Sequence, residues 1–82
     1  MLVLNKNSAE AQFYQIRFRG QLGSDWSDWF DGLTITPQPN GEMLLSGKIV
    51  DQAALYGILV KAQRLALHLI SLEVVRNHLE EV

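Results

Sequence analysis

The clearest pattern in the chain is an alternation of apolar and polar residues over Phe13–Arg19. Tyr14, Ile16 and Phe18 fall on one side of an extended chain and polar residues fall on the other, which is typical of a strand with one buried face. Three further segments show the same period of two, and the sequence therefore predicts four strands. The further segments are Leu33–Thr36, Glu42–Ile49 and Leu69–Val75.

A tight connection is expected between the second and third of these strands. Pro37-Gln38-Pro39-Asn40-Gly41 separates them, and an Asn-Gly pair accepts positive φ at both central positions of a turn. Prolines lack the backbone donor that a central strand needs, so this end of the hairpin is expected to be exposed. Gly47, inside the third strand, permits a bulge or the close approach of another segment.

A short helix is predicted between the first two strands. Ser24 is expected to cap its N-terminus, and Gly32 is expected to close its C-terminus. Trp26, Trp29 and Phe30 stand at positions i, i+3 and i+4, which share one face of an α-helix. We expect the three rings to complete the core, because large aromatic side chains dominate core energetics. A partner-binding role for these rings is the alternative.

The main helix is predicted over residues 52–66, with Asp51 as its N-cap. Gly57 interrupts its interior at a cost of about 1 kcal/mol relative to alanine, which a close contact with the sheet would justify. Seven residues form the apolar stripe by which this helix is expected to pack on the sheet. They are Ala54, Leu55, Ile58, Leu59, Ala62, Leu65 and Ala66.

These elements follow the order β-α-β-β-α-β, with a short first helix. The order predicts an α+β fold of the ferredoxin-like kind, in which both helices cover one face of a four-stranded antiparallel sheet. A single domain is expected over residues 12–76, between a flexible leader (1–11) and a frayed tail (77–82). The covered face of the sheet is predicted to hold Tyr14, Ile16, Phe18, Leu33, Ile35, Met43, Leu45, Ile70, Leu72 and Val74.

Length and composition narrow the possible classes of protein. A chain of 82 residues, 48% of them hydrophobic and 20% charged, fits one small folded domain. It has no cysteine and so no disulfide, and small domains without such links often gain stability by oligomerising. The net charge of −2 gives no electrostatic footprint for nucleic acid or anionic membranes. No signal peptide or bilayer-spanning run is recognisable, so a cytoplasmic location is expected.

Four parts of the chain, Tyr14-Gln15-Ile16-Arg17, the segment 26–35, Gly47 and the segment 51–57, carry a family resemblance. In these parts the chain resembles a group of short uncharacterised bacterial proteins from cyanobacteria, actinobacteria and related lineages. The resemblance covers most of residues 14–75 and implies no catalytic residues. The chain departs from the group at Tyr56, where histidine is common, and at Ala66 and His68, where glycine and proline are usual. The main helix is therefore expected to end less sharply. The shared segments are Trp26-Ser27-Asp28-Trp29-Phe30-Asp31-Gly32-Leu33-Thr34-Ile35, similar to W..WF.GLTI, and Asp51-Gln52-Ala53-Ala54-Leu55-Tyr56-Gly57, similar to the start of DQAALHGLL.

The sequence shows no arrangement of residues that predicts an enzyme. A metal site needs three or four convergent donors, whereas His68 and His78 stand apart in the sequence, so no metal or other cofactor is expected. Asp25, Asp28 and Asp51 are placed to cap helices or to meet their positive ends. No phosphate-binding loop or nucleophile elbow occurs. RNA binding of the RRM kind is disfavoured, because the third strand carries no aromatic pair.

The remaining prediction is a non-enzymatic interaction or regulatory module that forms a homo-oligomer, most simply a homodimer, or binds a protein encoded by an adjacent gene. Apolar residues on the uncovered face of the sheet suit either kind of contact. The alternatives are a sensor domain that binds a small metabolite and, less favoured, an RRM-like module. The candidate interaction surface comprises Phe13, Arg17, Leu44, Lys48, Tyr56 and Val60.

Overall fold

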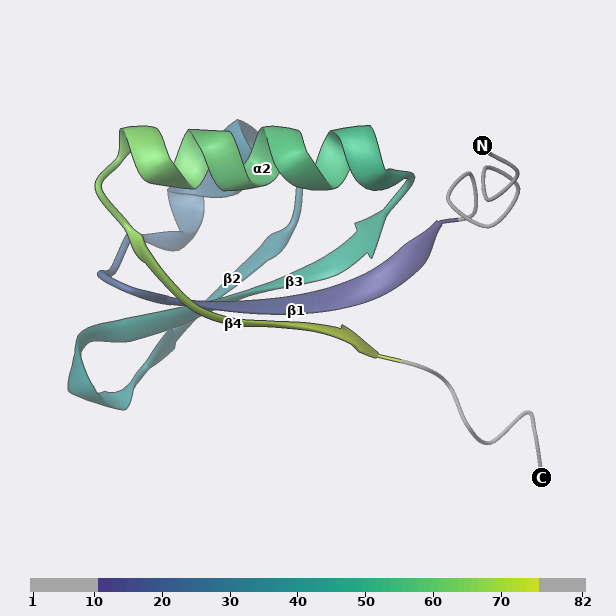
Figure 1. Cartoon of the computed structure of the whole chain (residues 1–82). Coiled ribbons are helices and arrows are strands. Elements are labelled where there is room, and N and C mark those ends of the chain that lie inside the picture. Colours follow the sequence, from purple (N-terminus) through teal and green to yellow (C-terminus); the bar gives the residue numbers. More distant parts are fainter. Residues whose placement is uncertain (1–10, 76–82) are drawn as a thin grey trace, which may run out of the picture.

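The structure, a computed structural model, describes residues 11–75. Four antiparallel strands form one sheet in the order β2-β3-β1-β4, and a 3-10 helix, η1, and an α-helix, α2, lie on one face of it (Figure 1). The predicted α+β class and four-stranded antiparallel sheet are confirmed. The bounds are β1 (Gln12–Arg19), η1 (Ser24–Phe30), β2 (Thr34–Gln38), η2 (Pro39–Gly41), β3 (Glu42–Ile49), α2 (Gln52–Arg64) and β4 (His68–Val75).

The connection between β1 and β2 differs from the predicted α-helix. Because η1 is a 3-10 helix of seven residues, the predicted order with two α-helices is met only in part. The N-cap is Gly23, and the residue in the left-handed conformation at the other end is Asp31, with φ 60°. The predictions of Ser24 as N-cap and Gly32 as C-cap are therefore wrong.

The 3-10 geometry separates the three large rings of this segment, because residues three apart share a face. Phe30 is fully buried beside Ser27, whose hydroxyl donates to the carbonyl oxygen of Leu33 at 2.7 Å. Trp26 and Trp29 share another face and remain 38% and 39% exposed. The prediction that all three rings complete the core is right for Phe30 and wrong for the tryptophans.

The core lies between the sheet and its two helices, and no polar or charged side chain of residues 11–75 is buried in it. Tyr14 and Leu72 pack against it as half-buried residues. Ile70 and Val74, which were predicted on the covered face, are exposed. Ile70 has no partner on β1, because the register shifts there and skips it. The buried residues are Ile16, Phe18, Phe30, Leu33, Ile35, Met43, Leu45, Ile49, Leu55, Ile58 and Ala62.

The β2–β3 turn confirms its prediction, since Asn40 and Gly41 both have positive φ, 68° and 76°. The predicted leader and tail, apart from Ala11, lie outside the described residues, as does His78. Within residues 11–75, no helix combines the length and the apolar character needed to cross a membrane.

Asp51 caps α2 as predicted, with its Oδ1 accepting the Ala54 backbone N–H at 2.8 Å. We expect Asp51→Ala to lower the free energy of unfolding by about 1 kcal/mol, because a free donor of the first turn loses its acceptor. Asp51→Asn keeps an acceptor oxygen and serves as the matched control. Urea denaturation measures both, and equal stability of the two variants would contradict the capping role.

The C-terminus of α2 is sharper than the sequence predicts. The Ala66 N–H donates to the Gln63 carbonyl at 2.9 Å, and the Leu67 N–H donates to the Ala62 carbonyl at 3.1 Å. These two bonds define a Schellman motif, which holds Ala66 in the left-handed region at φ 62°. The predictions that the helix includes Ala66 and ends loosely are therefore wrong.

Two substitutions near this helix are expected to stabilise the protein. A Cβ added at Gly57 would meet no described atom within 4 Å, so the expected close contact with the sheet is absent there. Gly57→Ala should therefore raise the free energy of unfolding by about 1 kcal/mol. Ala66→Gly should raise it by about 1 kcal/mol, because glycine adopts the left-handed conformation without strain. Urea denaturation measures both.

Gly47→Ala is the contrasting control for these substitutions. Its Cβ would lie 2.6 Å from Leu33 Cδ2, which confirms the predicted close approach at this glycine. We expect this variant to be destabilised. Loss of stability in Ala66→Gly would contradict the left-handed helix end.

Candidate interaction surface

Exposed apolar side chains concentrate on β4. None of its eight residues is buried, although most of them are apolar. β4 is an edge strand that pairs with β1 alone, so one side of its backbone faces away from the sheet of residues 11–75. An edge strand with exposed apolar side chains is a template for pairing with another chain. The exposed large apolar residues are Leu69, Ile70, Val74 and Val75.

The uncovered state of β4 follows from the small size of η1. Four strands spaced about 4.8 Å apart span about 14 Å, whereas one α-helix covers about 10 Å. η1 packs against β2 and α2 packs against β3, at the far side of the sheet from β4. One α-helix alone is thus narrower than the sheet, and β4, in which no residue is buried, is the strand with the least cover.

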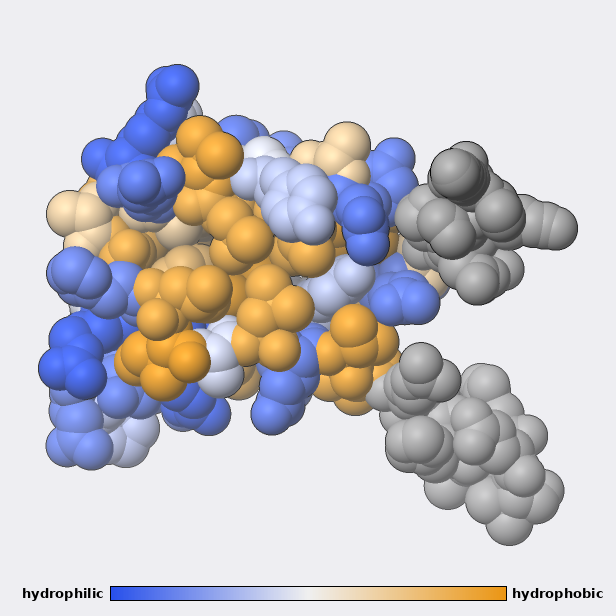
Figure 2. Space-filling model, viewed as in Figure 1, coloured by the Kyte–Doolittle hydropathy of each residue, from blue (hydrophilic) through white to orange (hydrophobic). Residues whose placement is uncertain are grey.

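One flank of α2 extends this apolar region. Lys61 marks the flank next to η1, because its Nζ lies 3.4 Å from Asp31 Oδ1. At about 100° per residue, Tyr56 and Leu59 fall on the other flank, whereas Val60 points away from the buried side of α2. Apolar side chains gather over α2 and β4 on this side of the molecule (Figure 2). We call this region the β4–α2 surface and define it by Tyr14, Tyr56, Leu59, Leu72 and Val74.

Four of the six predicted interaction residues lie together on the open face of the sheet. Phe13 is directly opposite Lys48, and Arg17 is directly opposite Leu44, across the β1–β3 pair. The Arg17 guanidinium already has a partner within the fold, since it lies 3.6 Å from Glu42 Oε1. This face therefore mixes one exposed ring with charged and half-buried side chains.

The other two predicted residues, Tyr56 and Val60, are 58% and 48% exposed on α2. The sheet separates them from Phe13 and its neighbours, so the six residues do not form one surface. Tyr56 lies on the flank of α2 away from η1, and Val60 lies on the outer side of α2, away from the sheet. Sequence reasoning missed the contribution of Leu72 and Val74, which it assigned to the core.

The half-exposed tryptophans form a cluster held by contacts within the chain. The Trp26 and Trp29 rings meet edge to face, with centroids 6.3 Å apart and planes at 88°. Lys61 Nζ lies 5.7 Å from the centroid of Trp29, within cation–π range. The same ammonium reaches the carboxylate of Asp31. These contacts tie η1 to α2, and the sequence could not predict them because they depend on the 3-10 geometry.

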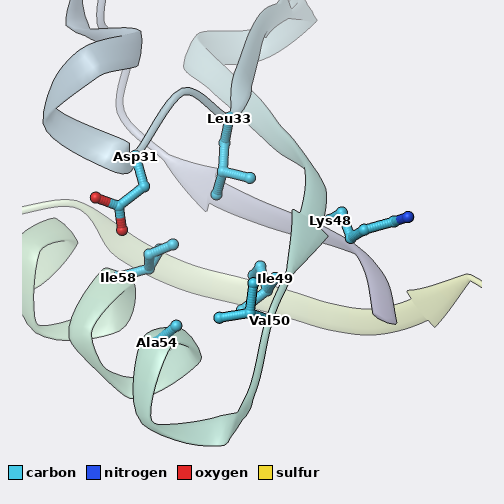
Figure 3. Close-up of a pocket in the computed structure, with 7 residues that line it drawn as sticks. All are labelled: Asp31, Leu33, Lys48, Ile49, Val50, Ala54 and Ile58. Atoms are coloured by element: carbon cyan, nitrogen blue, oxygen red, sulfur yellow. The ribbon is translucent and has the colours of Figure 1, made fainter. Parts of the chain in front are cut away.

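A small pocket lies where η1 ends, β3 ends and α2 begins (Figure 3). Its volume is about 220 Å³. Asp31 supplies a carboxylate at its rim, whereas the ammonium of Lys48 points away from the other lining side chains (Figure 3). The remaining lining is apolar and comprises Leu33, Ile49, Val50, Ala54 and Ile58.

Among residues 11–75, no three acidic or histidine side chains come together in a group that could hold a metal ion. The described surface offers apolar contact and, along the edge of β4, backbone hydrogen bonding. Both are means of binding another polypeptide.

A comparison of the chain with known protein families gives a match. A family model described as a domain of unknown function, DUF8691, matches residues 13–73. The chain belongs to the DUF8691 family. The matched part of this DUF8691 protein begins in β1 and ends in β4, so it includes η1, α2 and most of the β4–α2 surface. No curated protein and no solved structure matches the chain.

Proposed function

We propose that this DUF8691 protein is a small non-enzymatic interaction or regulatory module that acts as a homo-oligomer, in the first place a homodimer. The observation that carries the proposal is β4, an edge strand whose apolar side chains all remain exposed or half-buried. Clustered exposed apolar side chains mark sites of protein interaction. A chain of this size without disulfides also gains stability by burying such a surface against a partner.

The strand order supports a finer assignment to the ferredoxin-like plan. In the order β2-β3-β1-β4, β1 and β2 run parallel to each other, as do β3 and β4, and each pair is joined across the helical layer. These features support the split β-α-β-β-α-β arrangement as the underlying plan. In this chain η1 stands in place of the first α-helix, and the space beside α2 is available to a partner.

A second copy of the chain is the simplest partner. The net charge of −2 is small, so electrostatic repulsion between copies is weak. A two-fold dimer brings the same apolar patch of both copies into contact, and each copy covers the other.

Sedimentation velocity of the full chain, from micromolar to millimolar concentration, tests the proposal. We expect the mass to rise with concentration towards twice the 9.3 kDa of one chain. A single species at 9.3 kDa over the whole range would overturn the homo-oligomer.

The pocket beside Asp31 is the feature that would serve the alternative, a sensor for a small metabolite. Its volume of about 220 Å³ lies below the range of about 300–1,000 Å³ that is typical of ligand sites. Its polar lining is confined to the rim. We therefore rank the interaction module above the sensor, and a thermal-shift screen with small organic cations tests that order. A rise in melting temperature that Asp31→Asn abolishes would favour the sensor.

A further inference from the structure

We propose that two copies pair along their β4 strands, antiparallel and about a two-fold axis, so that the two sheets join into one. This inference rests on the proposed homo-oligomer and specifies its geometry. It assigns the β4 edge, together with the adjoining flank of α2, as a site that binds a second copy of this chain.

The two edges of the sheet differ in their capacity to pair. β2 contains Pro37, which has no backbone N–H to donate to a new strand. β4 contains no proline, and its outer backbone groups have no strand beside them within residues 11–75. Pairing of β4 with β4 therefore occupies the β4 edge of each copy. The two β2 edges, which contain proline, remain at the outer sides of the joined sheet. Such an assembly closes at two copies instead of growing into a fibre.

A second β4 would cover apolar side chains on both faces of the first. Leu72 and Val74 lie opposite Ile16 and Tyr14 and so share the helix-facing side. Val75 lies opposite Phe13 on the open side, and both are exposed. A strand about 4.8 Å away lies within reach of side chains on both faces.

A stable interface needs more residues than β4 alone provides. β4 has eight residues, whereas a standard interface uses about 20–30 residues on each side. The adjoining residues Tyr56, which is exposed, and Leu59, which is half-buried, lie on this flank of α2. We therefore place them in the same interface, against the partner's β4–α2 surface.

The register of the β4–β4 pair follows from the position of the skipped residue on β4 and from the charge of Glu73. Ile70 is skipped in the pairing with β1, so the regular part of β4 is Ser71–Val75, and the axis is expected within it. A two-fold axis at Glu73 would place two carboxylates directly opposite each other, which is destabilising. An axis at Leu72 instead brings Leu72 against its own copy and places Ser71 opposite Glu73, where the hydroxyl donates to the carboxylate. The geometry thus points to an axis at Leu72.

Disulfide cross-linking tests this register cleanly, because the chain contains no cysteine. In Leu72→Cys, the two cysteines would face each other with Cα atoms about 4.5–5.5 Å apart, within the range of a disulfide. In Ser71→Cys, the two cysteines would be diagonal neighbours about 7–8 Å apart, too far for an unstrained bond. Thr36→Cys places a cysteine on β2, at the other edge of the sheet, as a matched control.

We expect mild oxidation to cross-link Leu72→Cys at least about tenfold more than Ser71→Cys or Thr36→Cys, in line with the distance limits of the disulfide. If Leu72→Cys does not fold, differently tagged Ser71→Cys and Glu73→Cys chains are co-expressed, and the mixed disulfide is the expected product. Stronger cross-linking of Ser71→Cys or Thr36→Cys would overturn the geometry. So would the absence of specific cross-links in a chain that sediments as a dimer. A wild-type chain that sediments as a monomer would instead overturn the proposed function itself.

Discussion

Phe30→Ala is expected to lower the free energy of unfolding by about 3–5 kcal/mol, the usual cost of removing a buried phenylalanine. Phe30 is fully buried at the end of η1, and it joins the helical layer to the core of the sheet. Domains of this size have a total stability of about 0.05–0.15 kcal/mol per residue. For 82 residues this amounts to about 4–12 kcal/mol, so the variant should lose a large part of its stability, which urea denaturation would show.

Trp29→Ala is the matched comparison, because the two aromatic residues are adjacent and only one of them is buried. Trp29 keeps 39% of its surface exposed. Its removal costs the edge-to-face contact with Trp26 and the contact with Lys61, each worth about 1 kcal/mol. The covered part of the ring adds a burial contribution, so we expect a folded protein whose loss of stability is smaller than that of Phe30→Ala. Equal losses in the two variants would contradict the division of the rings between core and surface.

Val74→Glu is expected to weaken self-association at least about 100-fold, which corresponds to about 2.7 kcal/mol. Val74 is 39% exposed, so the single chain tolerates the carboxylate in contact with water. In a two-fold dimer through the β4–α2 surface, two copies of the new charge would be buried without a partner. Sedimentation equilibrium measures the dissociation constant.

Thr36→Glu adds the same charge at the opposite edge strand and is the control. We expect it to leave the dissociation constant within about threefold of the original value, because exposed substitutions outside an interface contribute little. Equal weakening by the two variants would indicate an effect of net charge alone. An unchanged constant in Val74→Glu would remove β4 from the interface.

The parts of the fold that could be predicted from the sequence are those with a strong local signal. The bounds of β3 were predicted correctly, because an alternating segment follows directly after Asn40-Gly41. The start of α2 was predicted correctly from Asp51, whose side chain makes the capping bond. Both signals act within a few residues, so tertiary contacts do not alter them.

The errors arise where two local interpretations are compatible with one pattern. Trp26 and Trp29 are three residues apart, a spacing that shares a face in both α- and 3-10 helices. Phe30 shares a face with Trp26 in an α-helix but not in a 3-10 helix. Which of the two helices forms depends on how Phe30 packs in the core. The segment Leu69–Val75 begins with two adjacent apolar residues, Leu69 and Ile70, so its pattern does not reveal that Ile70 is skipped in pairing with β1.

The sequence predicted individual residues of the interaction surface, but it did not predict how they come together. Tyr56 and Val60 were recognised as residues outside the core stripe of α2, but the side on which they lie depends on where η1 docks. The contact between Lys61 and Asp31 fixes that side, and it joins residues that are 30 positions apart in the sequence. A helix shorter than usual between the first two strands was the sequence signal that part of the sheet would lack cover.

The central claim is that a second copy covers the apolar side chains of β4. The most direct test is an isotope-filtered nuclear Overhauser experiment on a mixture of 13C-labelled and unlabelled full-length chains. We expect intermolecular contacts at the methyl groups of Leu72, Val74 and Leu59. Intermolecular contacts confined to Leu44 and its neighbours on the open face of the sheet, or the absence of any in a concentrated sample, would contradict the claim.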